Sequence, residues 1–374
     1  MSSHPLWNLS LATRLSLLRK DTYRVAYLAP KPDLGTFRYR AFNPTEALKS
    51  SSTHSASYFF YSDLALLDDL STWADALVLV RAPHDQRVDS IYRQFRNAGK
   101  KVYFDIDDLV FDSRYATLVA SSLGDELQEH DLNQWSAFIS NTGLALGRAD
   151  EIVTTNDFLA ARIRDFVDLP VHVVPNTFNS YQRASSEALP VRTPWPRGLS
   201  LGYFSGSHSH LLDFGVVASA LVAFLSRSPH SHLTVVGHLA LPAELEAFTE
   251  RITRLPFMDF LELQQAIRGV DLNIVPLQSS DFTSGKSELK YFEAGLVSTP
   301  TLASRTPVFE AAISEGETGF LADSGTWLNR LHEIEGLSPE LRQAVGEAAR
   351  VDAYKRYSPE SLVEHVTAVF GQEK

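Results

Sequence analysis

Two lysines and a glutamate share one face of a predicted helix in the second half of the chain. Lys286, Lys290 and Glu293 recur at i, i+4 and i+7, a spacing that brings side chains together on neighbouring helical turns. Two cations at a helix start suit a phosphate, because the free backbone N–H groups and the helix dipole also favour an anion there. One turn further on, a carboxylate can accept hydrogen bonds from the hydroxyls of a ribose. We therefore expect these three residues to bind a sugar nucleotide.

The helix that positions these side chains is expected to run from Lys286 to Val297, where apolar residues recur at helical spacing. Ser284 and Ser287 are candidate N-caps, and Ser287 joins the expected donor-binding set. Strands are expected on either side, at Leu272–Leu277 and Thr301–Ala303. The alternative interpretation is an ordinary amphipathic helix with an i, i+4 pair on its surface.

Four aspartates gather at the end of another predicted strand, Lys101–Asp105. They are Asp105, Asp107, Asp108 and Asp112, and neighbouring carboxylates repel one another unless a cation, a hydroxyl or a backbone donor engages them. A functional site is therefore expected here. Asp107 is our first candidate catalytic residue, with Asp105 and Asp108 as the other candidates.

Two loops that follow predicted strands supply further candidates. After the strand Leu199–Phe204 comes S-G-S-H-S-H, in which Gly206 permits close approach of the backbone and Ser207 offers N–H and hydroxyl groups to a diphosphate. His210 would add a proton-dependent charge, and a metal site shared with His208 is the alternative.

The other loop follows the first predicted strand, Tyr23–Ala29, and is rich in proline and glycine. Gly35, Arg38 and Arg40 lie in or just after it. At the carboxyl edge of a parallel sheet such residues line the ligand crevice. We expect these three in that crevice, on its acceptor side or elsewhere in it, and the alternative is that the arginines are simply solvated.

The elements that must position all these residues alternate between strand and helix through both halves of the chain, which predicts an α/β fold with two Rossmann-like domains. Helix or turn is expected at Phe248–Leu255, and the asparagines Asn156 and Asn176 are expected to cap turns. Further strands are expected at Ser57–Tyr61, Ala76–Val80 and Leu233–Val236.

A polar, proline-rich stretch from Ser180 to Gly198 is the expected linker. We therefore expect an N-terminal acceptor-side domain at residues 1–190 and a C-terminal nucleotide-binding domain at 191–355. A last helix is expected within 356–374. The amphipathic segment Leu6–Lys20 is expected to pack on that domain, and the alternative is peripheral contact with a membrane surface.

Composition excludes several classes of function. The 374 residues contain no cysteine, which excludes disulfides, thiolate metal sites and a cysteine nucleophile. The net charge of -11 argues against a nucleic-acid groove, because duplex binding needs a basic face. No apolar run has transmembrane length and no signal-peptide pattern begins the chain, so we expect a cytoplasmic protein, with the inner face of the membrane as the alternative place.

Three motifs resemble those of retaining GT-B glycosyltransferases, the large bacterial group 1 type. They are E-A-x5-P-x-x-A-S from Glu293 to Ser304, P-N-T from Pro175 to Thr177, and G-E-T-G-F-L from Gly316 to Leu321. The resemblance implies two Rossmann-like domains that face each other across a cleft, with the last helix at 356–374 crossing back to the first domain. It also implies that a glutamate at Glu293 holds the donor ribose. Asp107, or less directly Asp105 or Asp108, would then orient the donor sugar or accept a proton from the acceptor. The family usually has a second glutamate eight residues earlier, where this chain has Gly285, and a glycine where this chain has Ser298.

The resemblance implies a function as well. A sugar would pass from a UDP-, GDP- or dTDP-linked donor to a hydroxyl of a glycan or lipid-linked glycan, with retention of configuration and without an obligatory metal or cofactor. Bacterial surface polysaccharide or glycoconjugate synthesis would be the setting.

Two other classes of function stay open at this point. The run F-D-I-D-D-L-V shares two aspartates with the D-x-D-G-T-[LV] motif of HAD-type phosphatases but lacks its glycine and threonine. A Mg²⁺-dependent phosphohydrolase with Asp105 as nucleophile is therefore one alternative. A sugar-nucleotide-binding protein without catalytic activity is the other.

Overall fold

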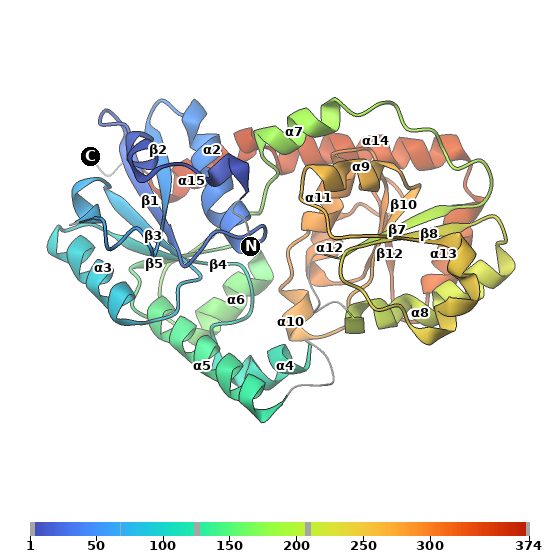
Figure 1. Cartoon of the computed structure of the whole chain (residues 1–374), viewed down its shortest axis with the longest axis horizontal. Helices are drawn as coiled ribbons and strands as arrows, with labels where there is room; N and C mark the ends of the chain where they lie inside the picture. Colours follow the sequence, from blue (N-terminus) through green and yellow to red (C-terminus); the bar gives the residue numbers. More distant parts are fainter. Residues whose placement is uncertain (1–3, 68, 123–127, 206–210, 372–374) are drawn as a thin grey trace.

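Two parallel sheets of six strands each form the centres of two α/β halves (Figure 1). The computed structural model describes residues 4–67, 69–122, 128–205 and 211–371. The order of the first sheet is β2-β1-β3-β4-β5-β6 and that of the second is β12-β11-β10-β7-β8-β9. This confirms the expected α/β class with two Rossmann-like sheets.

Most strands of the N-terminal half are buried because helices cover both sides of the sheet, while the edge strand β6 is half-buried. They are β1 (Tyr23–Ala29), β2 (His54–Phe60), β3 (Ala76–Val80), β4 (Val102–Ile106), β5 (Glu151–Thr154) and β6 (Val171–Val173). The helices are α1 (Leu11–Ser16), α2 (Asn43–Ala47), α3 (Gln86–Asn97), α4 (Ala116–Ser121), α5 (Glu129–Leu146) and α6 (Asp157–Phe166).

The C-terminal half repeats the same alternation. Its strands are β7 (Ser200–Phe204), β8 (His232–Val236), β9 (Ile252–Leu255), β10 (Leu272–Val275), β11 (Thr301–Ser304) and β12 (Phe320–Ala322). Its helices are α8 (Leu211–Arg227), α9 (Glu262–Arg268), α10 (Asp281–Ser284), α11 (Leu289–Gly295), α12 (Pro307–Ala312), α13 (Trp327–Gly336) and α14 (Pro339–Arg356).

The C-terminal part of the chain packs against the N-terminal half. The last helix, α15 (Pro359–Val369), packs on α2, and its Leu362 and Val366 belong to the same buried cluster as Val25 of β1. In Figure 1 the C-terminus accordingly lies on the side of the first sheet. Among the described residues, no helix combines the length and the apolar character needed to cross a bilayer.

One prediction of local structure was wrong. The segment expected as helix or turn contains strand β9, which pairs with β8 over Ile252–Leu255. Pairing with another strand decided the structure of a stretch whose own pattern was weak. The expected linker lies between β6 and β7, and it begins with a helix, α7 (Ser180–Glu187), which is capped by Asn179 and packs on α9.

The amphipathic N-terminal segment packs on the N-terminal half, as one of the two interpretations predicted. Arg14 is buried and binds Asp63 with two hydrogen bonds of 2.5 and 2.7 Å. Arg19 donates to backbone carbonyls of Ser51 and His54. The two arginines are therefore not available as a basic face toward a membrane.

Candidate active site

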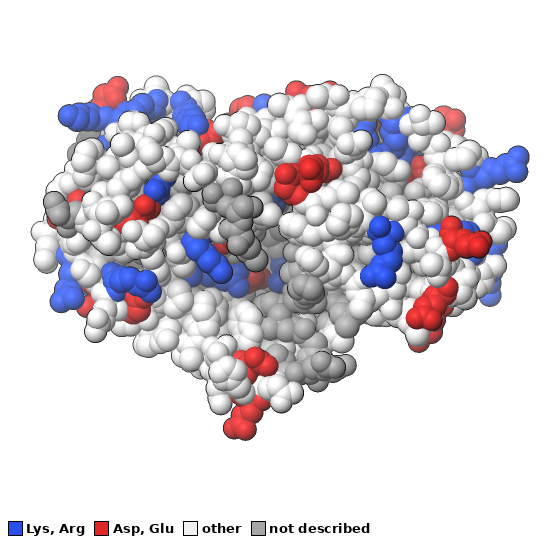
Figure 2. All heavy atoms as spheres, in the orientation of Figure 1, with Lys and Arg blue, Asp and Glu red and all other residues white. Residues whose placement is uncertain are grey.

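A cavity of about 980 Å³ lies between the two halves and is lined by residues of both. Strand order reverses between β1 and β3 in one sheet and between β7 and β10 in the other, and ligands of open α/β sheets bind at such points. The volume suits a nucleotide-sized ligand. Figure 2 shows the hollow between the two halves, with basic and acidic side chains at its lower end. We call this space the cleft cavity.

Glu293 lies in the cleft cavity on α11 and is 4% exposed. Its Oε1 accepts three hydrogen bonds, from the hydroxyl of Tyr39 at 2.6 Å, from Nη2 of Arg38 at 3.2 Å and from Nε2 of Gln182 at 3.2 Å. None of these donors belongs to the second sheet or its helices. The carboxylate expected to hold the ribose therefore belongs to the C-terminal half but is held by donors from outside it.

Lys286 and Lys290 also line the cleft cavity, but their ionic surroundings differ. Nζ of Lys286 lies 3.2 Å from Oδ1 of Asp108 and 4.2 Å from the ring centre of Phe282. Lys290 has no ion pair within the part of the chain that the structure describes. Burial lowers the pKa of Lys290 to about 8, although Asp213 and Glu293 oppose this shift. A buried cation with so little compensation is well placed to receive an anion.

The start of the donor helix differs from the prediction. Helix α11 begins at Leu289, and Lys286 and Ser287 lie in the loop before it. Neither Ser284 nor Ser287 is an N-cap, since Glu288 occupies the N-cap position without a side-chain hydrogen bond. Ser287 Oγ instead accepts a hydrogen bond from Nδ2 of Asn176 at 3.1 Å, across the cleft. Asn176 is thus a contact between the halves and not the expected turn cap.

The loop before α11 rests on the N-terminal half. A Cβ atom at Gly285 would lie 2.9 Å from Cδ2 of Leu159 on α6, and Nδ2 of Asn156 donates to the carbonyl of Gly285 at 3.2 Å. Oδ1 of Asn156 caps α6, as expected. A side chain at residue 285 would therefore require Leu159 to shift, which gives a physical reason for glycine there.

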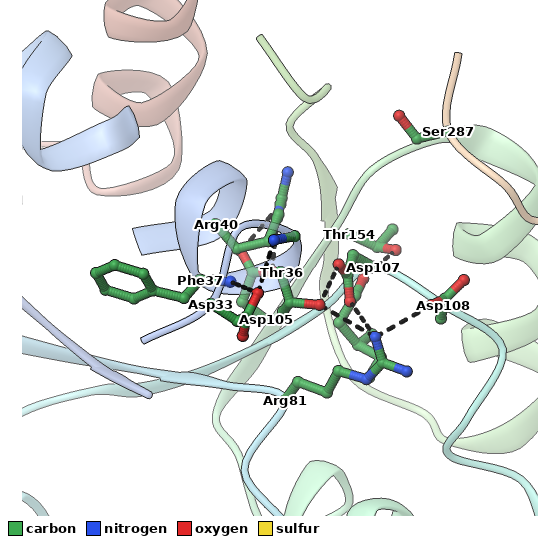
Figure 3. Close-up of polar contacts among 12 residues, drawn as sticks. Asp33, Thr36, Phe37, Arg40, Arg81, Asp105, Asp107, Asp108, Thr154 and Ser287 are labelled. Carbon is green, nitrogen blue, oxygen red and sulfur yellow. Dashed lines mark hydrogen bonds and ion pairs between the residues drawn. The ribbon is translucent and has the colours of Figure 1, made fainter. Parts of the chain in front are cut away.

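Asp107 and Asp108 lie at the mouth of the N-terminal sheet and are held by one arginine (Figure 3). Nη1 of Arg81 lies 3.3 Å from Oδ1 of Asp107 and 3.1 Å from Oδ2 of Asp108. The hydroxyl of Thr36 donates to the other oxygen of Asp107 at 2.8 Å. Burial opposes ionisation of Asp108, but Lys286 and Arg81 outweigh it and hold the pKa of Asp108 below its ordinary value.

Arg81 adopts a backbone conformation that is uncommon for a residue with a side chain, with φ at 45°. Strain of this kind clusters at functional sites, because the surrounding structure must hold it in place. Here it brings the guanidinium between two carboxylates of the cleft cavity.

Asp105 and Arg40 occupy a different position from the one expected. Nε and Nη2 of Arg40 bind the two oxygens of Asp105 at 2.7 and 2.9 Å, and neither residue lines the cleft cavity. Both are almost fully buried. Burial raises the pKa of Asp105 to about 6, against the opposing effect of Arg40. This pair, which we call the floor pair, joins the N-terminal π-helix to β4, and Asp105 cannot serve there as an exposed nucleophile.

Of the remaining expected residues, Gly35, Arg38 and Ser287 line the cleft cavity. Gly206, Ser207, His208 and His210 lie outside the described residues. Among those described, no group of three histidine, cysteine, aspartate or glutamate side chains is arranged to hold a metal ion.

Several functional candidates escaped the sequence analysis. Asp33 lines the cavity, and burial raises its pKa while its Oδ1 accepts N–H groups of Gly35 and Phe37. Its position in the loop after the first strand was the available signal. Arg81, Tyr39 and Gln182 had none, because nothing local marks them as partners of Asp107 or Glu293.

Apolar side chains from both halves also line the cleft cavity. From the N-terminal half, Trp135 and Phe138 of α5 pack edge to face, with ring centres 5.7 Å apart. From the C-terminal half, Phe257, Met258 and Leu263 contribute. The cavity therefore offers apolar surface as well as charged groups to a ligand.

Known proteins resemble this chain in both family and fold. Residues 202–334 match the family model described as Glycosyl transferases group 1, whereas no curated protein sequence matches the chain. HepE of Anabaena, solved in complex with UDP, superposes with a TM-score of 0.58 at 13% identity over 93% of this chain and 99% of that one.

Two further solved structures superpose equally well. Sucrose-phosphate synthase from Thermosynechococcus elongatus has a TM-score of 0.59 at 13% identity, over 93% of this chain and 98% of that one. WaaG, a glycosyltransferase involved in lipopolysaccharide biosynthesis, has a TM-score of 0.57 at 13% identity, over 93% of this chain and all of that one. At such identities the superpositions establish the shared GT-B fold, and residues 202–334 of this chain are similar to the group 1 glycosyltransferases.

Proposed function

We propose that the protein transfers a sugar from a nucleoside-diphosphate sugar to a hydroxyl group of a glycan or lipid-linked glycan. One observation supports this most strongly. Lys286, Lys290 and Glu293 converge in one cavity opposite Asp107 and Asp108 of the other half. Such a set offers cations to a diphosphate, a carboxylate to a ribose and further carboxylates to sugar hydroxyls.

On this proposal the apolar surface beside Phe257 and Met258 receives the base, and Glu293 binds the ribose. Lys290 and Lys286 bind the diphosphate and stabilise the charge that develops on it as the bond to the sugar breaks. When the donor binds, Lys286 would exchange its ion pair with Asp108 for one with the diphosphate. The first donor class to test is UDP-linked, because HepE was solved with UDP and with UDP-glucose.

The acceptor would approach from the N-terminal half, beside Trp135 and Phe138, whose rings suit the apolar face of a sugar. Both oxygens of Asp107 already accept hydrogen bonds from Thr36 and Arg81, so we assign it to orientation. Oδ2 of Asp33 makes no hydrogen bond with any described residue. The raised pKa of Asp33 makes it a stronger base than an ordinary aspartate, and we assign the acceptor proton to it.

Three finer statements also remain proposals. They are the division into domains at 1–190, 191–355 and 356–374, retention of configuration without an obligatory metal, and a cytoplasmic role in surface polysaccharide or glycoconjugate synthesis. The two sheets, which lie within residues 23–173 and 200–322, are compatible with that division.

The test is a thermal-shift panel of UDP, GDP and dTDP and their sugars, with and without Mg²⁺, on the wild type and Glu293→Gln. A ligand that binds only the folded state raises the melting temperature. We expect one nucleotide class to stabilise the wild type without metal, and the variant to respond much less. Absence of a response to every nucleotide, together with a response to Mg²⁺ alone, would overturn the proposal.

A further inference from the structure

The oxygen atoms of Glu293 have different surroundings. Oε1 accepts all three hydrogen bonds from Tyr39, Arg38 and Gln182. Oε2 accepts none from any described residue, and it is not among the sealed polar atoms without a partner. Because Glu293 lines the cleft cavity, Oε2 is the oxygen left for a ligand.

The three donors to Oε1 come from outside the unit that contains Glu293. Arg38 and Tyr39 lie in or beside the π-helix Arg38–Phe42 of the N-terminal half, and Gln182 lies on α7 between the two sheets. The next residue but one, Arg40, anchors the same π-helix to β4 through the floor pair. Segments of π-helix are rare and are frequently found at functional sites.

Arg38 holds the carboxylate of Glu293 at a cost in stability. Its guanidinium carbon lies 4.1 Å from the ring centre of Tyr39 and 4.5 Å from that of Phe260, so aromatic rings cover it. Its Nε and Nη1 are sealed from solvent and have no hydrogen-bond partner. Buried donors without partners lower stability. Stability alone therefore does not explain this residue, whereas control over Glu293 does.

The hydroxyl of Tyr39 is the shortest of the three contacts. Burial raises the pKa of Tyr39 well above its ordinary value, so the phenol stays protonated and always donates. Hydrogen bonds from a neutral donor to a carboxylate are among the stronger ones in proteins. This contact is also the most readily removed alone, since phenylalanine keeps the ring and its packing.

We propose that Arg38, Tyr39 and Gln182 are positioning residues that hold Oε1 of Glu293 so that Oε2 faces the ribose of the donor. The inference rests on the proposed function, in which Glu293 binds that ribose. It adds that the donor site is completed by the N-terminal half and the connecting helix. Donor affinity then depends on the arrangement of the two halves.

The experiment measures the affinities of UDP, 3′-deoxy-UDP and pyrophosphate by calorimetry for the wild type, Tyr39→Phe and Tyr92→Phe. Tyr92 is the matched control, because its buried hydroxyl donates to the carbonyl of Ala145 at 2.7 Å and it does not line the cleft cavity. For Tyr39→Phe we expect UDP to bind about tenfold more weakly, as for loss of a hydrogen bond to a charged group. Pyrophosphate, which has no ribose, should bind as it does to the wild type.

The deoxy ligand separates positioning from general damage. In the wild type, removal of the 3′-hydroxyl should weaken binding, and in Tyr39→Phe this penalty should shrink, because Oε2 is no longer directed at the ribose. Tyr92→Phe should keep the full penalty. A second variant, Gln182→Met, preserves side-chain length and should reproduce the pattern with a smaller loss.

Two results would overturn the inference while leaving the proposed function intact. One is UDP binding of wild-type strength in both Tyr39→Phe and Gln182→Met, alongside weak binding in Glu293→Gln. The other is equal loss of UDP and pyrophosphate in Tyr39→Phe, which would mean that the change acts on the whole site. If the wild type binds none of UDP, GDP and dTDP, the proposed function itself fails.

Discussion

Arg38 and Arg40 are two residues apart in one π-helix, and both bind a buried carboxylate, yet their surroundings differ. Arg40 binds both oxygens of Asp105, the carbonyl of Val174 and Oδ1 of Asn176. Arg38 makes one hydrogen bond, at 3.2 Å, to Glu293. Its other two nitrogens have no hydrogen-bond partner.

The difference gives the two arginines different roles within one helical turn: Arg40 stabilises the fold, and Arg38 acts at the site. A buried ion pair contributes to a stable fold only when its geometry is good and its other polar atoms are satisfied, which describes the floor pair. The contact between Arg38 and Glu293 leaves donors unpaired and one carboxylate oxygen open toward a cavity. At a cavity wall, a ligand can supply the hydrogen bond that the open carboxylate oxygen lacks.

The strongest test of this comparison breaks the floor pair. Asp105→Asn leaves the Arg40 cation buried without its counter-charge, and the free energy of unfolding should fall by about 3–5 kcal/mol. Chemical denaturation would measure this. The half-exposed pair between Arg24 and Asp75 provides a control, because Asp75→Asn should cost only about 0–1 kcal/mol.

The same variant also separates the transferase from the phosphohydrolase. The transferase predicts that folded Asp105→Asn keeps most of its sugar-transfer activity. A variant of wild-type stability without activity would mean that Asp105 is catalytic, contrary to its burial.

The second test removes the charge of Glu293 from the wall of the cleft cavity. Glu293→Gln keeps the shape of the side chain but removes the charge that the ribose would meet, so UDP should bind about ten- to a hundredfold more weakly. Glu335→Gln is the control, since that carboxylate accepts hydrogen bonds from Ser228 and Ser231 in the same half and lies outside the cleft cavity. Equal UDP affinity in both variants would contradict a ribose contact at Glu293.

The third test sharpens the comparison by pH. Lys290 has a folded-state pKa lowered to about 8, so its ammonium form predominates below that value and disappears above it. Because a diphosphate favours the ammonium form, UDP affinity should be greatest below pH 8. It should fall about tenfold between pH 7 and pH 9 as the protonated fraction drops. Lys290→Arg stays charged across this range, and calorimetry should show a nearly flat profile for it.

The smallest expected effect concerns the seam between the halves. Gly285→Ala would bring a Cβ atom within 2.9 Å of Cδ2 of Leu159, and the overpacking should cost about 1 kcal/mol of stability. The side chain of Leu159 can yield, so the fold should survive. Leu159→Val should restore the melting temperature of Gly285→Ala if this contact is the cause, and failure to do so would locate the strain elsewhere.

Much of the site was predictable because it depends on local spacing. The positions of Lys286, Lys290 and Glu293 along one segment brought all three to one cavity, as expected. The start of α11 was wrong by three residues, since the loop before it is shaped by Leu159 and Asn176 of the other half. Asp105 could not be told apart from Asp107 and Asp108, because its partner Arg40 lies 65 positions away along the chain.

The sequence alone determined the alternation of strands and helices, the two-sheet fold and the residues that face the cavity on α11, because hydrophobic periodicity acts over a few residues. Only the tertiary structure decided which charged groups bind one another. Arg40 meets Asp105 across 65 positions of the chain and Arg38 meets Glu293 across 255. Such pairings depend on burial and on how the two halves pack, and local pattern contains neither.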